Sequence, residues 1–161
     1  MNIFTADTSG NTPLESISLD NAGRLIGGQT VYLANRILDH VFGKDSFTPP
    51  DTLYVGLWEV PITTQFTGSS VGEVMAGSYA RVAVSNTFIS WSTAGSGSKM
   101  IETQLDFPEA VENWGTVTHF AVLDAAVAGN MYVFGALASP KLVNAGDTFR
   151  FNQESIIIRI D

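Results

Sequence analysis

Residues 115–138, GTVTHFAVLDAAVAGNMYVFGALA, decide the fold because they contain two apolar segments joined by a connection of hairpin length. The two segments, residues 115–124 and 130–138, are rich in the β-branched and aromatic residues that strands favour. The connection ends on Gly129, and glycine accepts the backbone conformations that tight turns need. We therefore predict a β-hairpin at this point of the chain.

Strand patterns continue on both sides of this hairpin. Residues 52–59 (TLYVGLWE) are bulky on both faces, which predicts a strand buried on both sides, and residues 79–87 alternate between small apolar and polar side chains. Residues 147–152 and 155–161 predict a tight final hairpin around Gln153-Glu154. About six or seven short strands favour a mainly β fold, either an antiparallel β-sandwich or a partly open barrel. Two long loops, residues 61–78 and 92–98, lie between the strands.

An amphipathic helix is predicted at about residues 29–42, before the β domain of about 52–161. Thr30 is the expected N-cap and Gly43 the expected C′ residue. A helix of this length is marginal in water, so its apolar face must dock on the sheet or on a partner. That face consists of Val31, Ala34, Ile37, Leu38, Val41 and Phe42.

The first 27 residues are rich in Thr, Ser, Asn, Asp and Gly and predict an extended N-terminal arm. Such an arm either becomes ordered on a neighbouring subunit or remains a frayed terminus. We expect one domain to follow it, over residues 28–161.

The composition favours a protein whose surface is partly hidden in an assembly. Hydrophobic residues make up 45% of the chain and charged residues 15%, although an ordinary β domain with a large core is an alternative. The net charge of −8 argues against binding to nucleic acid or to an anionic membrane. The sequence contains no cysteine, no signal peptide pattern and no membrane-spanning run, so we expect a soluble protein made in a cytoplasm.

The chain offers no pattern typical of an active site. The segment 95–99 (GSGSK) lacks the spacing of a phosphate-binding loop, and no metal-binding spacing joins His40 and His119. Glu73 and Asp106 could form a carboxylate pair, but nothing in the sequence fixes their separation. We therefore predict a protein that is not an enzyme and has no catalytic, cofactor-binding or metal-binding residues.

Aromatic residues leave two interpretations open. They could stack on the sugar rings of a host glycan, or they could fill the core or an interface, which is the more usual place for large aromatic side chains. The residues concerned are Tyr54, Trp58, Trp91, Trp114 and Tyr132.

An ordered set of short motifs resembles a family of small structural proteins of tailed bacteriophages, labelled tail-fibre-like or virion-associated. The resemblance covers residues from about 28 to the C-terminus. The motifs are YLANRILDHVFG (32–43), LYVGL (53–57), GSYAR (77–81), WGTVTHF (114–120), DAA (124–126), GN (129–130), FGAL (134–137) and NAGD (144–147).

This resemblance implies a helix followed by a compact β domain in the phage particle, without known catalysis or assigned functional residues. We expect a homo-oligomer, a homotrimer in particular, that contacts other virion proteins of the tail, neck or capsid. It could act as a fibre or neck component or as a capsid decoration or cement protein; a module that binds host polysaccharide is the alternative. For protein–protein contacts or structural support the candidates are Ile37, Val41, Tyr79, Arg81, Trp114 and Asp124.

Overall fold

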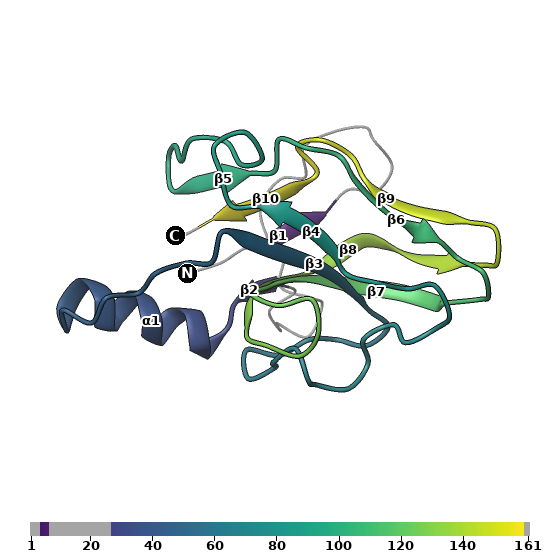
Figure 1. Cartoon of the computed structure of the whole chain (residues 1–161), viewed down its shortest axis with the longest axis horizontal. Coiled ribbons are helices and arrows are strands. Elements are labelled where there is room, and N and C mark those ends of the chain that lie inside the picture. Colours follow the sequence, from purple (N-terminus) through teal and green to yellow (C-terminus); the bar gives the residue numbers. More distant parts are fainter. Residues whose placement is uncertain (1–3, 7–26, 160–161) are drawn as a thin grey trace.

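A computed structural model describes residues 4–6 and 27–159 (Figure 1). Most of the predicted arm therefore lies outside the described residues, and so does the C-terminal end of the last predicted strand. The elements are β1 (Phe4–Ala6), β2 (Gly27–Gln29), α1 (Val31–Phe42), β3 (Thr52–Trp58), β4 (Val82–Ser85), β5 (Ser98–Met100), β6 (Leu105–Glu109), β7 (Gly115–Leu123), β8 (Met131–Val143), β9 (Thr148–Phe151) and β10 (Ile156–Arg159).

The described strands form two sheets. The larger has eight strands, with the hydrogen-bonded order β4-β3-β7-β8-β1-β10-β5 and with β2 also paired to β8. The smaller contains β6 and β9, at the opposite end of the molecule from α1 (Figure 1). All pairs are antiparallel except β1 with β8, and the described strands do not close into a barrel. The prediction of a mainly β, antiparallel fold preceded by one helix is confirmed.

The central hairpin is present as predicted. β7 and β8 pair from Gly115 opposite Val143 to Leu123 opposite Met131. β8 extends past the predicted end at residue 138 to Val143. Its ladder with β7 is interrupted after Ala136 and resumes at Lys141. The interruption includes Pro140, which has no N–H to donate to a ladder.

The predicted final hairpin is wrong. β9 pairs with β6, and β10 pairs with β1 and β5, so the chain passes from one sheet to the other between them. Backbone hydrogen bonds with Ile101 on both sides of the crossing direct this path: Glu154 N–H donates to Ile101 O, and Ile101 N–H donates to Ile156 O. Glu154 has a φ of 64°, which turns the chain sharply at this point.

The core lies on both faces of the central strands. On β7, Phe120 and Val122 belong to the main cluster, whereas Ala121 and Leu123 join a smaller cluster with Trp58. Five of the seven residues of β3 are buried, and the other two, Thr52 and Tyr54, are half-buried. This burial confirms that β3 packs on both sides, as its bulky sequence predicts.

His119 makes the stability of this core dependent on pH. It pairs with Trp58 across β7 and β3, its Nδ1 lies 2.8 Å from Thr118 Oγ1, and burial lowers its pKa from 6.5 to about 4. The folded protein therefore favours the neutral imidazole, and this contribution is complete above pH 6.5 and is lost as the pH falls toward 4.

We expect His119→Gln to reduce the acid sensitivity of the fold. Between pH 7 and pH 4 the wild-type protein should lose about 1–2 kcal/mol more of its unfolding free energy than the variant, after allowance for partial exposure of the ring. Urea unfolding at several pH values measures this difference. Equal losses in the two proteins would show that His119 does not carry the effect.

Candidate functional site

Helix α1 is held to the edge of β8 by its N-cap residue. Thr30 is the N-cap, as predicted, and its Oγ1 accepts a hydrogen bond of 3.3 Å from the Leu33 N–H. The Thr30 N–H donates to Tyr132 O at 2.9 Å, and its buried hydroxyl donates to Met131 O. The helix begins at Val31 and ends at Phe42. Gly43, expected as the C′ residue, is the C-cap with φ −105°, and the positive φ of 59° falls on Lys44.

The chain that returns from α1 to β3 contacts the helix through two of its polar side chains. Arg36 pairs with Asp45 at 3.2 Å, and the Phe47 N–H donates to His40 Nδ1 at 3.3 Å. At the base of the helix, Tyr32 stacks on Tyr132 with ring centroids 5.8 Å apart. Tyr32 and Phe47 also pack against the main core cluster, so these contacts hold the base of the helix against the sheet.

Most of the apolar side of α1 is exposed to solvent. No residue of the helix is fully buried, and Leu38, Val41 and Phe42 are 53%, 59% and 82% exposed. α1 projects beyond the sheets, with its far end away from the strands (Figure 1). We name this surface, Val31, Ala34, Ile37, Leu38, Val41 and Phe42, the α1 face. Ile37 and Val41, which the sequence suggested as candidates for protein–protein contacts, both belong to the α1 face.

Arg81 holds together a separate group of loops. Its side chain is 2% exposed, and its Nε and Nη2 donate to both carboxylate oxygens of Glu73 at 2.6 Å. The remaining donors reach the carbonyl oxygens of Gly68, Ala125 and Ala128, each at 2.8 Å. One guanidinium thus connects the long loop after β3 to the β7–β8 turn.

Asp124 supports the same turn from its other side. Its carboxylate accepts hydrogen bonds of 2.7 Å from the backbone N–H and from the side-chain amide of Asn130. Gly129 has a φ of 77°, a conformation that favours glycine. Arg81 and Asp124 therefore act on one turn without pairing with each other. The partner of Arg81 is Glu73, and no pattern in the sequence predicts this pairing.

Tyr79 and Trp114 lie next to this group, within the core. The Tyr79 hydroxyl donates to Glu73 at 2.9 Å and accepts from the Leu57 N–H at 2.8 Å. Burial raises the pKa of the Tyr79 phenol, and the negative charge of Glu73 raises it further. Trp114 meets the Tyr79 ring edge-on at 5.4 Å and is 2% exposed, which makes it a core residue.

The three tryptophans do not offer a surface for sugar stacking. Trp58, Trp91 and Trp114 are at most 2% exposed, and their indole nitrogens are inaccessible to solvent. Of the two interpretations left open by the sequence, these three residues fit the second: they fill the core. The strongly exposed aromatic side chains in the described part are instead Phe42 and Phe88, at 82% and 75%.

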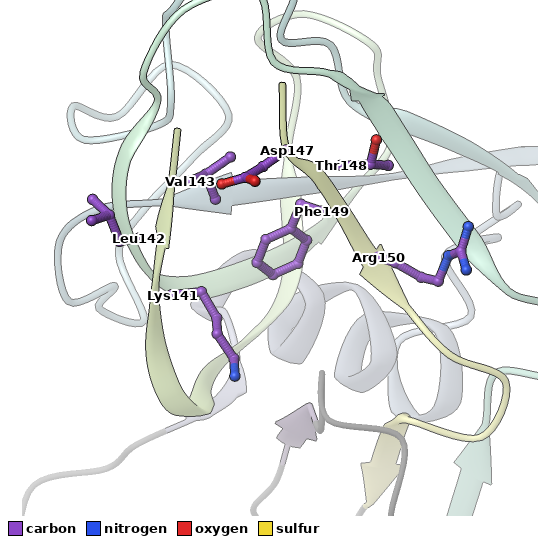
Figure 2. A pocket seen from close by; sticks show the side chains of 7 residues that line it. All are labelled: Lys141, Leu142, Val143, Asp147, Thr148, Phe149 and Arg150. Carbon is purple, nitrogen blue, oxygen red and sulfur yellow. The ribbon is translucent and has the colours of Figure 1, made fainter. Parts of the chain in front are cut away.

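Three charged residues, Lys141, Asp147 and Arg150, are among those that line a depression in the described part of the chain. This shallow depression of about 300 Å³ lies between β8 and β9, where Lys141 and Arg150 lie on opposite sides of the Phe149 ring (Figure 2). Arg150 pairs with Asp106, and Glu73 pairs with Arg81, so the two carboxylates considered as a catalytic pair belong to separate ion pairs. Residues 95–98 form a tight turn, with reciprocal backbone hydrogen bonds of 2.9 Å between Gly95 and Ser98.

The described ranges contain neither a cluster of metal-ligating side chains nor a membrane-spanning helix. Within residues 4–6 and 27–159, no three His, Asp or Glu side chains gather where they could hold a metal ion. In the same ranges, no helix has the length and apolar character needed to cross a membrane.

We expect Arg81→Met to lower the unfolding free energy by about 3–5 kcal/mol, because it leaves the half-buried Glu73 carboxylate without its partner. Arg150→Met is the matched control, since it removes an exposed ion pair with Asp106 and should cost no more than about 1 kcal/mol. Urea unfolding measures both. Adding Glu73→Gln to Arg81→Met should restore part of the loss, and equal effects of the two single variants would contradict this assignment.

Comparison with known families gives one match. Residues 28–159 match the family described as podophage GP4 fiber I protein gp80. Comparison with curated proteins gives no match. The matched region contains α1, the whole β7–β8 hairpin and the Arg81 group. The match begins at residue 28, as does the resemblance to tailed-phage structural proteins. The chain belongs to the podophage GP4 fiber I protein gp80 family.

Proposed function

We propose that this protein is a non-enzymatic building block of the phage particle that assembles with copies of itself through the α1 face. The observation that carries the proposal is the exposure of apolar side chains on α1: Val31, Leu38, Val41 and Phe42 are 38%, 53%, 59% and 82% exposed. Full burial of a Leu, Val or Phe side chain contributes about 1.5–3 kcal/mol, so covering this face stabilises an assembly substantially.

The spacing on the helix supports a second copy as the occupant. Val31, Ala34, Leu38 and Val41 follow one another at steps of three, four and three residues, the spacing of a coiled-coil seam. No charged side chain interrupts these positions, so identical helices can meet along them without burying a charge. A closed ring of three copies is the arrangement that we propose.

Within the particle, we propose a position on the tail or neck as a fibre component, with neighbouring virion proteins as further partners. Membership of a fibre protein family supports this position over a capsid decoration or cement role. Imaging intact virions that carry a labelled copy of the protein tests it: label at the tail or neck supports the proposal, and label over the capsid shell contradicts it.

We expect the purified chain to have a mass near three times 17.3 kDa by light scattering. The double variant Val41→Asp/Phe42→Ser should shift the mass toward one copy at the same concentration. Its folded core should be unaffected, because both side chains are more than half exposed.

The matched control places the same changes elsewhere, at Val127→Asp and Phe88→Ser. These residues are 82% and 75% exposed but lie outside α1, so this control should keep the mass of the wild-type protein. A wild-type mass of one copy over a wide concentration range would contradict self-assembly. Equal dissociation of the two double variants would contradict the choice of the α1 face.

A further inference from the structure

The edge of β8 that faces away from β7 is occupied by two short strands in succession. β2 pairs antiparallel with β8, from Gly27 opposite Gly135 to Gln29 opposite Val133. β1 pairs in parallel, with Ala6 opposite Leu137. β1 also pairs with β10, and therefore joins β10 and β5 to the rest of the large sheet (Figure 1). We name the position between β8 and β10 that β1 fills the β1 slot.

Two neighbouring points on this edge are far apart in the sequence. Ala6 and Gly27 pair with β8 residues that are two positions apart, which corresponds to about 7 Å along a strand. Twenty residues, 7–26, separate Ala6 from Gly27 in the sequence. A segment of this length can span up to roughly 66 Å when extended, whereas a domain of this size has a radius of gyration of about 15 Å. The connection is thus long enough to reach the same slot in an adjacent copy.

We propose that in the assembled protein β1 fills the β1 slot of a second copy, so that each copy donates this strand to its neighbour. This inference rests on the proposed self-assembly and names the segment that is exchanged. The donated strand makes the same backbone hydrogen bonds as one that folds back on its own chain, so the exchange sacrifices no ladder. Passing the strand in one direction around a closed ring leaves no slot empty.

The position of α1 supports a second copy as the donor. The N-cap of the helix is Thr30, whose N–H donates to Tyr132 O on β8, and β2 and then β1 follow along the same edge. From Tyr132 to Leu137 is five residues, or about 17 Å of strand. The α1 face therefore begins about 17 Å along this edge from the β1 slot, a distance that the connection of residues 7–26 is long enough to span.

Engineered disulfides test the exchange, because the chain contains no cysteine of its own. Thr5 lies opposite Ile157 in the β1–β10 register, so Thr5→Cys/Ile157→Cys places two thiols across the slot. After mild oxidation we expect covalent dimers and trimers on a non-reducing gel. The control pair Thr116→Cys/Leu142→Cys joins neighbouring strands of the β7–β8 hairpin, and should give single chains with an internal disulfide.

A mixing experiment identifies the donor directly. The single variants Thr5→Cys and Ile157→Cys, refolded together, should give a covalent dimer that links one chain of each kind, as peptide mapping by mass spectrometry would show. Phe4→Cys with Ile158→Cys, the next register pair, repeats the test if the first pair does not fold.

The outcomes separate this inference from the proposed function. A disulfide between residues 5 and 157 within single chains, in a protein that light scattering still finds oligomeric, overturns the exchange and leaves self-assembly intact. A protein of one-copy mass contradicts both. Failure of both slot pairs to oxidise, when the hairpin control does, shows that β1 does not occupy the slot and also overturns the exchange.

Discussion

The backbone groups of β8 are the constraint on which the rest of the structure depends. One edge of this strand pairs with β7, and the other receives Thr30, β2 and β1 in turn. Buried N–H and C=O groups must find partners, so these short segments are held where β8 offers unpaired groups. The start of the helix, the connection to β10 and the centre of the core are consequently fixed relative to one strand.

The buried ion pair of Arg81 and Glu73 holds two loops together. The Arg81 guanidinium has more donors than Glu73 alone can satisfy, and the carbonyl oxygens of Gly68, Ala125 and Ala128 accept the remainder. Burying an ion is favourable only when it is paired and fully hydrogen-bonded. The long loop after β3 and the β7–β8 turn are therefore fastened together, although neither contains a regular element that could do this by packing.

Apolar residues are divided between a closed core and an open helix. The three tryptophans fill the interior, whereas the α1 face has no cover within the described part of the chain. The first turn of α1 is held on the sheet by the Thr30 cap and by the stacking of Tyr32 on Tyr132, and the apolar residues of its later turns are exposed. Exposed apolar residues of this kind are typical of a surface that another polypeptide covers, which agrees with membership of a fibre protein family.

The sequence by itself determined the local features: the α1 stripe with its Thr30 cap, the β7–β8 hairpin and the burial of β3 on both sides. These depend on side-chain periodicity and on turn residues that act within a few positions of one another. Tertiary structure alone decided that β9 pairs with β6 instead of β10, that Arg81 meets Glu73, and that the stripe of α1 faces outward. These outcomes depend on backbone and charged groups far apart in the chain, because periodicity shows which side of an element is apolar but not what will cover it.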